Sequence, residues 1–158
     1  MNIKKTKGFT IVEVLVAMVI LSIGVLGLGV MQLTSLQNTQ GGQMTSQASI
    51  LAYDIIDSMR TNAPSVTAGN YAIAIDTATP EAPVCYGADA DCTGAQMATS
   101  DVNHWRAALG NSLPSGNGSI ATADLGGSTL ATITITWVDP YSVANGNEQI
   151  VLTAELLQ

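Results

Sequence analysis

The sequence predicts an α+β fold in which one long N-terminal helix packs on a small C-terminal antiparallel sheet, with one extra short helix. Three observations lead to this class. Residues 9–31 form an apolar run with a single charge, the residues after it repeat apolar side chains at helical spacing, and two C-terminal stretches alternate polar and apolar residues. With 158 residues, the chain has room for one globular domain besides the apolar run.

The apolar run at residues 9–31 predicts a membrane-spanning helix. Its 23 residues extend about 35 Å as a helix, more than a hydrocarbon core of roughly 30 Å. Glu13 is its one charge, and a carboxylate near the middle of a bilayer costs about 2.5 to 3.5 kcal/mol. Such residues are usually functional, so Glu13 is a candidate functional residue. The alternative is a plain single-pass anchor in which Glu13 has no role.

The charges of the chain predict its topology and exclude one class of partner. The basic residues are Lys4, Lys5, Lys7, Arg60 and Arg106. Three of the five precede the apolar run, which predicts a cytoplasmic N-terminus and an exported C-terminal region. Without those lysines the formal side-chain charge falls from −7 to −10. Because such a chain repels phosphate backbones, we expect no direct nucleic-acid binding.

The apolar run differs from the core of a removable secretory signal. Such a core has about 7 to 15 apolar residues and is followed by a small-x-small cleavage site. This run is longer, and a polar, helix-compatible sequence follows Met31 in place of such a site. We therefore expect the apolar helix to be retained in the mature protein.

The helix is predicted to continue beyond the apolar run with an amphipathic pattern. From Gln43 onward the apolar residues recur at steps of three and four, as one stripe of Met44, Ala48, Leu51, Ile55 and Met59. Gly41-Gly42, just before this stripe, is a point at which the helix could break. Asn62-Ala63-Pro64 is expected to end the helix, because proline disfavours helical geometry at the residue before it.

Between this helix and the C-terminal strands, the sequence predicts loops and a second helix. Residues 65–99 are rich in Ala, Thr, Gly, Pro and Asp, and contain at most a short strand near residues 71–75. The stretch SDVNHWRAALGNSLP then predicts a helix capped by Ser100 or Asp101 and ended by Pro114. Its apolar face comprises Val102, Trp105, Leu109 and Leu113.

The C-terminal part predicts two antiparallel strands. Leu130 to Val138 alternates Thr with Ile and Trp, and Glu148 to Leu157 alternates in the same way. The nine residues between them include Asn145-Gly146, a turn signal. A sheet resting on the amphipathic half of the long helix would give each apolar face a partner.

Cys85 and Cys92 lie in the region expected to be exported, where thiols are oxidised. Their spacing closes a small loop, and a disulfide there contributes about 2.5 kcal/mol in the chain-entropy model. A pair of free thiols is the second interpretation. A metal site formed with Asp89 and Asp91 is the third and the weakest, because thiolates and carboxylates favour different metals.

The sequence contains no recognisable catalytic constellation. His104 is the one histidine, and no G-x-S-x-G, P-loop or dinucleotide fingerprint occurs. Trp105 and Trp137 are predicted core residues, and Arg60 and Arg106 are predicted to pair with nearby aspartates, Arg60 with Asp57. We therefore expect no enzymatic activity, no cofactor and no metal.

The stretch KGFTIVEVLVAMVIL resembles the class III signal of type IV pilins and pseudopilins. The matching features are a short basic leader, Gly8 before the cleavage site, Phe9 after it, and Glu13 five positions into the mature chain. The resemblance implies that prepilin peptidase cuts between Gly8 and Phe9 and methylates the amine of Phe9. It also implies that Glu13 meets the N-terminal amine of a neighbouring subunit and so favours one register during assembly.

The resemblance implies a domain plan and a location. Residues 1–8 are a cleaved cytoplasmic leader, 9–31 a transmembrane or filament-core helix, 32–62 its amphipathic continuation, and 63–158 an exported α+β region. The protein would begin in the inner membrane, with a periplasmic C-terminal domain, and would then enter an extracellular pilus. Its partners would be prepilin peptidase and other major and minor pilins.

Several looser blocks, among them ILAYDIIDSMRTN and ATITITWVD, resemble minor pilins of the PilV type. They imply a minor pilin that assists pilus initiation and assembly, with a role in surface attachment or motility. Alternative functions are a minor pseudopilin of type II secretion and a tip-exposed adhesion or binding module. A membrane-anchored hydrolase is disfavoured by the missing motifs. Residues 77–90 match none of the blocks.

Overall fold

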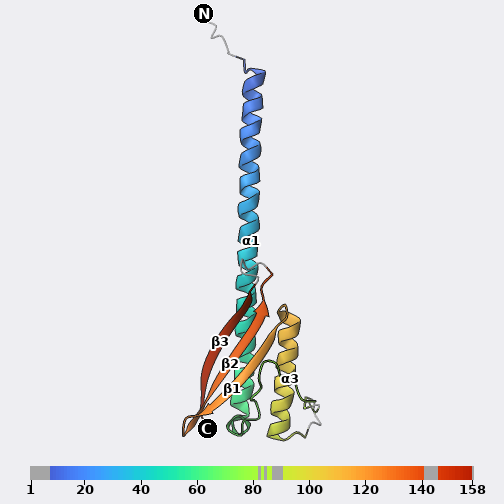
Figure 1. Ribbon diagram of the computed structural model, residues 1–158, viewed down its shortest axis with the longest axis vertical. Helices are drawn as coiled ribbons and strands as arrows, with labels where there is room; N and C mark the ends of the chain where they lie inside the picture. Colours follow the sequence, from blue (N-terminus) through green and yellow to red (C-terminus); the bar gives the residue numbers. More distant parts are fainter. Residues whose placement is uncertain (1–7, 82, 84, 87–90, 141–145, 158) are drawn as a thin grey trace, which may run out of the picture. The chain divides into compact units, whose positions relative to one another are not determined.

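A computed structural model describes residues 8–81, 83, 85–86, 91–140 and 146–157. The chain divides into two compact units, Met1–Gln40 and Gly41–Gln158, which are described separately here. The elements in chain order are α1 (Ile11–Thr61), α2 (Ala63–Thr67), α3 (Gly94–Ser112), β1 (Asn117–Asp124), β2 (Ser128–Val138) and β3 (Asn147–Leu157). This is the predicted α+β class, with a long N-terminal helix and a small antiparallel sheet (Figure 1).

In the first unit, helix α1 presents its apolar side chains outward. Every described residue from Gly8 to Leu36 is exposed, and α1 is long and apolar enough to cross a membrane. Ser22, in the middle of the apolar run, donates its hydroxyl to the Met18 carbonyl at 2.7 Å. That bond satisfies the hydroxyl within the helix, as a membrane segment requires.

In the second unit, the predicted amphipathic stripe of α1 is confirmed. Six residues of α1 are buried, namely Ala48, Leu51, Ala52, Ile55, Ile56 and Met59. Gly41-Gly42 lies inside α1 and does not end it. The helix ends at Thr61, as the Asn62-Ala63-Pro64 signal predicts, and Pro64 occupies the first turn of α2, where its missing N–H is tolerated.

Helix α3 begins earlier than the sequence analysis predicts. Its N-cap is Thr93, whose side chain accepts from the Gln96 N–H while the Gln96 side chain accepts from the Thr93 N–H. The predicted cap at Ser100 or Asp101 is therefore wrong, and both of those residues are buried within the helix. The Thr-x-x-Gln spacing is a capping box and was the sequence signal for the true start.

The sheet has three strands in the order β1-β2-β3, each pair antiparallel. The two predicted strands are confirmed as β2 and β3, whereas β1 was missed. Its sequence, NGSIATAD, is weakly apolar, and Ile120 is its one buried large apolar residue. The predicted short strand near residues 71–75 is reduced to a single bridge between Ile73 and Ile120. Asn145 of the predicted turn lies outside the described residues.

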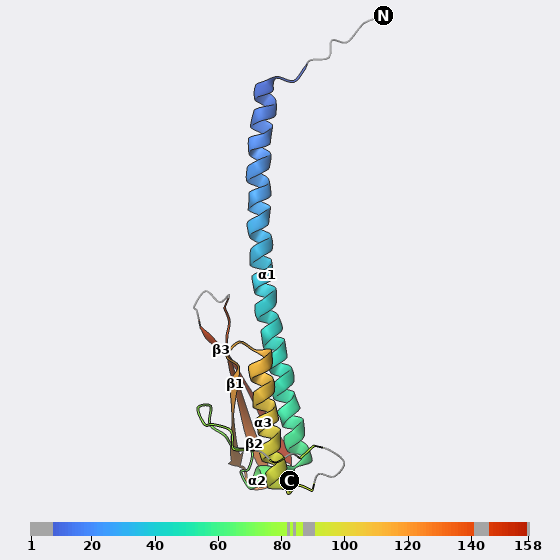
Figure 2. The ribbon, with the colours of Figure 1, turned by 90° about the vertical axis from the view of Figure 1, so that its right-hand side faces the viewer.

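The core lies between the sheet and two helices. Figure 2 shows α3 and the C-terminal part of α1 on the same face of the sheet. Trp105 joins the three elements. Its Nε1 donates to the Leu51 carbonyl of α1 at 3.0 Å, and a Cβ at Gly118 of β1 would lie 2.4 Å from its Cη2. Gly118 is thus needed for the close approach of α3 and β1. Trp105 and Trp137 are both core residues, as predicted.

Candidate functional site

The sequence-predicted processing residues lie immediately before α1. Gly8 and Phe9 precede the helix, and the Phe9 side chain is 82% exposed. Thr10 is the residue before the first helical position. The peptide bond between Gly8 and Phe9 is therefore outside any regular element and accessible from solvent.

Thr10 caps the start of the helix and places Glu13 in the first turn. The Glu13 N–H donates to Thr10 Oγ1 at 3.3 Å and to the Thr10 carbonyl at 3.1 Å. Thr10 and Glu13 have the spacing of a capping box, of which this Thr10 half is formed. A carboxylate in the first turn also interacts favourably with the helix dipole. The local structure thus accounts for a Glu at this position in part, without any partner subunit.

The Glu13 carboxylate receives no hydrogen bond and no ion pair from any residue that the structure describes. Instead it lines an apolar groove on the surface of α1 with Phe9, Val14, Ala17, Met18 and Leu21. Along the described part of the apolar run, the hydroxyls of Thr10 and Ser22 are both satisfied within the helix. Glu13 therefore presents an uncompensated charge on an apolar surface, which a membrane or a helix bundle would not tolerate alone.

In the second unit, Cys85 and Cys92 form a disulfide with an S–S distance of 2.09 Å. The disulfide interpretation is thereby confirmed, and the free-thiol and metal interpretations of this pair are wrong. Asp91 is exposed, and Asp89 lies outside the described residues. Cys85 itself is 4% exposed, so the bridge attaches residue 85 to the start of α3.

Asp101 of α3 connects this disulfide segment to the core. It accepts from the Tyr71 hydroxyl at 2.6 Å and from the Tyr86 hydroxyl at 2.8 Å. The Asn62 side chain donates to the Tyr71 oxygen at 3.2 Å and to the Gly94 carbonyl at 2.8 Å. The buried carboxylate is therefore hydrogen-bonded on both oxygens, and its two tyrosine partners could not be inferred from the sequence.

The Tyr71–Asp101 pair predicts a pH dependence. Burial first, and then the hydrogen bond to Asp101, raise the pKa of Tyr71, and the same causes raise the pKa of Tyr86. The tyrosine pKa is about 10 in an unfolded chain. The stabilisation is therefore complete below a pH of about 10 and is lost as the pH rises through the higher pKa of the folded state. Urea unfolding of the full chain in detergent, followed by circular dichroism at increasing pH, should show this decline.

The matched variants for this prediction are Tyr71→Phe and Tyr53→Phe. Tyr71→Phe should flatten the alkaline decline, and it should also lower stability at neutral pH because Asp101 loses a donor. Tyr53 is 58% exposed, so Tyr53→Phe should leave the profile unchanged. Equal profiles for the two variants would contradict the prediction.

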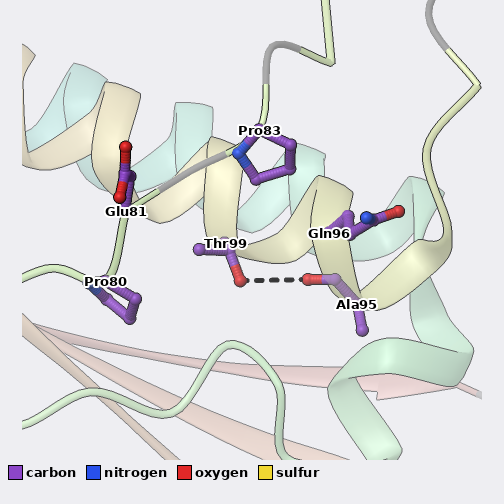
Figure 3. Close-up of a pocket in the computed structure, with 6 residues that line it drawn as sticks. All are labelled: Pro80, Glu81, Pro83, Ala95, Gln96 and Thr99. Atoms are coloured by element: carbon purple, nitrogen blue, oxygen red, sulfur yellow. Dashed lines mark hydrogen bonds between the residues drawn. The ribbon is translucent and has the colours of Figure 1, made fainter.

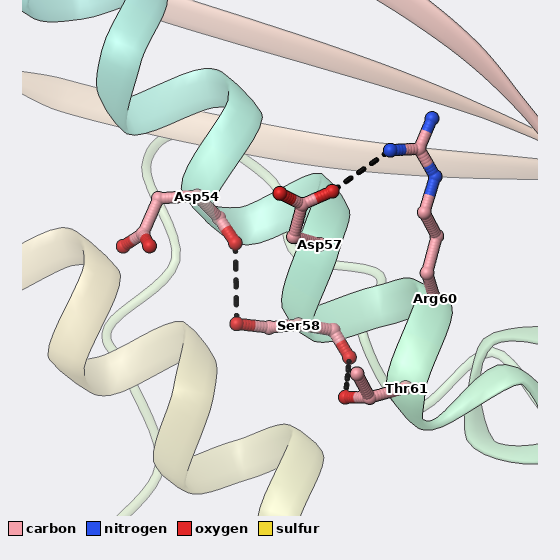
Figure 4. Close-up of polar contacts among 5 residues, drawn as sticks. All are labelled: Asp54, Asp57, Ser58, Arg60 and Thr61. Atoms are coloured by element: carbon pink, nitrogen blue, oxygen red, sulfur yellow. Dashed lines mark hydrogen bonds and ion pairs between the residues drawn. The ribbon is translucent and has the colours of Figure 1, made fainter.

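The two arginines have different partners. Arg60 pairs with Asp57 at 2.8 Å, as predicted (Figure 4), but both side chains are exposed and such pairs contribute about 0.2–1 kcal/mol. The predicted aspartate partner of Arg106 is wrong. Arg106 donates instead to the backbone carbonyls of Gly118, Ala74 and Thr77. It holds residues 74–77 against β1, and burial lowers its pKa.

The remaining surface features are shallow. A depression beside α3 is lined by Pro80, Glu81, Pro83, Ala95, Gln96 and Thr99, and the Thr99 hydroxyl turns back to the Ala95 carbonyl (Figure 3). His104 is exposed, with its ring 5.7 Å from the ring of Tyr86. Among the described residues there is no group of three His, Cys, Asp or Glu that could hold a metal. The N-terminal segment with Glu13 is therefore the candidate functional site.

Comparison with known protein families gives the same location. Residues 3–29 match the prokaryotic N-terminal methylation motif, which defines the class of protein: a chain with a class III signal. Residues 30–103 match the type IV pilin family Tt1218. The two adjacent matches cover the signal, all of α1 and the segment into α3, and the chain belongs to the type IV pilins. No curated protein and no solved structure matches the chain.

Proposed function

We propose that the chain is a minor pilin of a bacterial type IV pilus, inserted through its N-terminal helix and assisting pilus initiation and assembly. The observation that carries the proposal is the Glu13 carboxylate, which lies four residues after Phe9 on an apolar helix surface without a partner among the described residues. The match of residues 3–29 to the N-terminal methylation motif supports processing of this same segment.

In the proposed mechanism, prepilin peptidase cuts between Gly8 and Phe9 and methylates the new amine. The new amine carries a positive charge and Glu13 carries a negative charge, and both lie near the same end of the apolar helix. When helices from several subunits pack together with an axial offset, the amine of one subunit compensates the carboxylate of the next. Because an unpaired buried charge is strongly unfavourable, this pairing selects one register over the others.

The proposed location follows from the same segment. Residues 9–31 anchor the unassembled chain in the inner membrane, with its N-terminus in the cytoplasm and residues 63–158 in the periplasm. On assembly the apolar helix moves from lipid into the filament. The disulfide between Cys85 and Cys92 is the kind of bond that an oxidising compartment maintains.

The minor role and the PilV-type subgroup are supported by the looser sequence blocks in residues 50–62 and 131–139. The same N-terminal motif would also serve a minor pseudopilin of type II secretion or a tip-exposed adhesin. Recovery of the chain from pili would indicate a pilus subunit, and recovery from the filament of a type II secretion system would indicate a pseudopilin. Normal pilus number with loss of attachment in a deletion strain would instead indicate adhesion.

The proposal is tested by N-terminal mass spectrometry of the chain recovered from sheared filaments. We expect a mature chain that begins at methylated Phe9 and lacks residues 1–8. As a control, Gly8→Val should block the cut and keep the full-length chain in the membrane fraction, because a bulky residue replaces the glycine at the cleavage site. A filament-borne chain that retains residues 1–8, or a chain that has lost residues 9–31, would overturn the proposal.

A further inference from the structure

The two edges of the sheet differ in how they are protected. The outer edge of β1 is covered at Ile73, which exchanges two backbone hydrogen bonds with Ile120 at 2.9 and 3.0 Å. Arg106 and Asn117 hold the same covering segment through its carbonyls, Arg106 at Ala74 and Asn117 at Ile75. The β1 edge is thus closed to other strands near its centre.

The outer edge of β3 has no strand partner among the residues that the structure describes, and β3 forms the end of the sheet away from α3 (Figure 1). The strand is 11 residues long and pairs with β2 residue for residue, without a bulge. Its sequence, NEQIVLTAELL, contains no Lys and no Pro. Bulges, lysines and prolines are common devices against edge pairing, and β3 has none of these three, so it remains competent to accept another strand.

The register identifies the peptide groups that face this open edge. The N–H and C=O of Ile120 point away from β2, toward Ile73. Ile120 and its β2 partner Ile133 are therefore a non-hydrogen-bonded pair, and the N–H and C=O of Ile133 point toward β3. Ile133 pairs with Leu152, and alternation then turns the N–H groups of Val151 and Thr153 toward the open edge. Both side chains are exposed, Val151 at 54%.

The charge of the chain indicates what kind of strand fits. The charged residues of β3 are Glu148 and Glu155, and the mature chain would carry a side-chain charge of −10. Antiparallel pairing of β3 with a second copy would place four carboxylates on one short ladder and would join two strongly acidic chains. Like charges across strands are destabilising, so a second copy is a poor occupant and a basic strand is a good one.

We infer that the open edge of β3 receives an extended segment of a different pilin subunit, one that presents Lys or Arg near Glu148 or Glu155. The added strand makes main-chain hydrogen bonds to the outward peptide groups of Val151 and Thr153, as in β-strand addition generally. This inference rests on the proposed function, because it takes the partner from the same filament. It adds a lateral contact made by the exported region to the contact made by the N-terminal helix.

The test uses the full chain in its own cells, with a photoreactive benzoylphenylalanine in place of Val151. Irradiation should produce an adduct with another pilin chain, and mass spectrometry should place the crosslink in a Lys- or Arg-containing segment of that chain. In the Thr153→Pro background the adduct should fall at least about tenfold, because proline removes an outward donor and blocks the approaching backbone.

Two variants serve as controls for Thr153→Pro. Thr153→Ala keeps the N–H and should keep the adduct, and Thr122→Pro places the same change at the outward face of β1 and should also keep it. The thermal midpoint of the Thr153→Pro chain should stay near that of the wild type, because the Thr153 N–H is outside the β2–β3 ladder.

An adduct between two copies of this chain, or no adduct from a chain that is present in filaments, would overturn the inference. An adduct insensitive to Thr153→Pro would also overturn it. A chain that is absent from filaments and unprocessed at Gly8 would instead contradict the proposed function, so the two failures are distinguishable.

Discussion

The Glu13→Gln variant should enter filaments on the order of 100-fold less efficiently than the wild type. Removing one member of a buried ion pair leaves the other charge unpaired, which costs about 3 to 5 kcal/mol, or at least two orders of magnitude in an equilibrium constant. In this chain the unpaired group would be the methylated amine of a neighbouring subunit. The measurement is the amount of chain in sheared filaments relative to the membrane fraction, by quantitative immunoblot.

The Glu13→Gln substitution distinguishes the effect of the charge of Glu13 from the effect of its position in the first helical turn. A Gln at the third helical position is compatible with a capping box, so the variant retains the local helix start while it loses the carboxylate. Thr10→Ala is the matched control, because it removes the side-chain cap seen at 3.3 Å and leaves the charge intact. Thr10→Ala should have a small effect on incorporation. If it were as defective as Glu13→Gln, then helix capping and not charge pairing would explain the residue.

Cleavage at Gly8 must be followed in both variants. We expect cleavage to proceed in Glu13→Gln, so that the loss arises at assembly. Incorporation of Glu13→Gln at the wild-type level would exclude the register role.

The Trp105→Ala variant should lower the free energy of unfolding of the second unit, Gly41–Gln158, by about 3 to 5 kcal/mol, the range for truncation of a buried aromatic residue. Trp105 is 2% exposed, and its removal leaves a void where α1, α3 and β1 meet. Urea unfolding of the full chain in detergent, followed by circular dichroism, measures the change.

The two buried tryptophans provide a matched comparison. Trp105→Phe removes the hydrogen bond from Nε1 to the Leu51 carbonyl, whereas the Nε1 of Trp137 has no partner among the described residues. Trp137→Phe should therefore be milder, by roughly the 0.5–1.5 kcal/mol of one hydrogen bond. Equal losses at the two positions would show that the Leu51 contact contributes nothing to stability.

Local patterns were sufficient to predict α1, most of α3 and two of the strands, whereas the short helix α2 was missed. The stripe from Met44 to Met59 repeats with the period of a helix, and the threonines of β2 alternate with its buried residues. Both patterns arise because one face of the element is buried and the other is exposed to solvent. Each pattern can therefore be recognised within a single segment of the sequence. The candidate site was found differently: Glu13 is the single charge of the apolar run, and Gly8 and Phe9 follow from the resemblance to the class III signal, whose residues are close in sequence.

Strand β1 and the partner of Arg106 required information from distant segments, whereas the start of α3 had a local signal, the Thr93 capping box, that the prediction did not use. Position 118 of β1 must be glycine to leave room for Trp105, and this requirement is imposed by α3. Arg106 donates to carbonyls on two separate segments, residues 74–77 and Gly118, which lie side by side only in the folded protein. A cation with several carbonyl acceptors needs no aspartate, so the expectation of an ion pair failed.

The sequence alone thus determined the long apolar helix and the single carboxylate at Glu13 within it, because both depend on residues that are close to one another in the chain. The tertiary structure decided how Asp101 is satisfied by Tyr71 and Tyr86, and which edge of the sheet remains open. Those features depend on groups separated by 15 or more residues. Local periodicity carries no information about such pairs, because their proximity is set by the packing of whole elements.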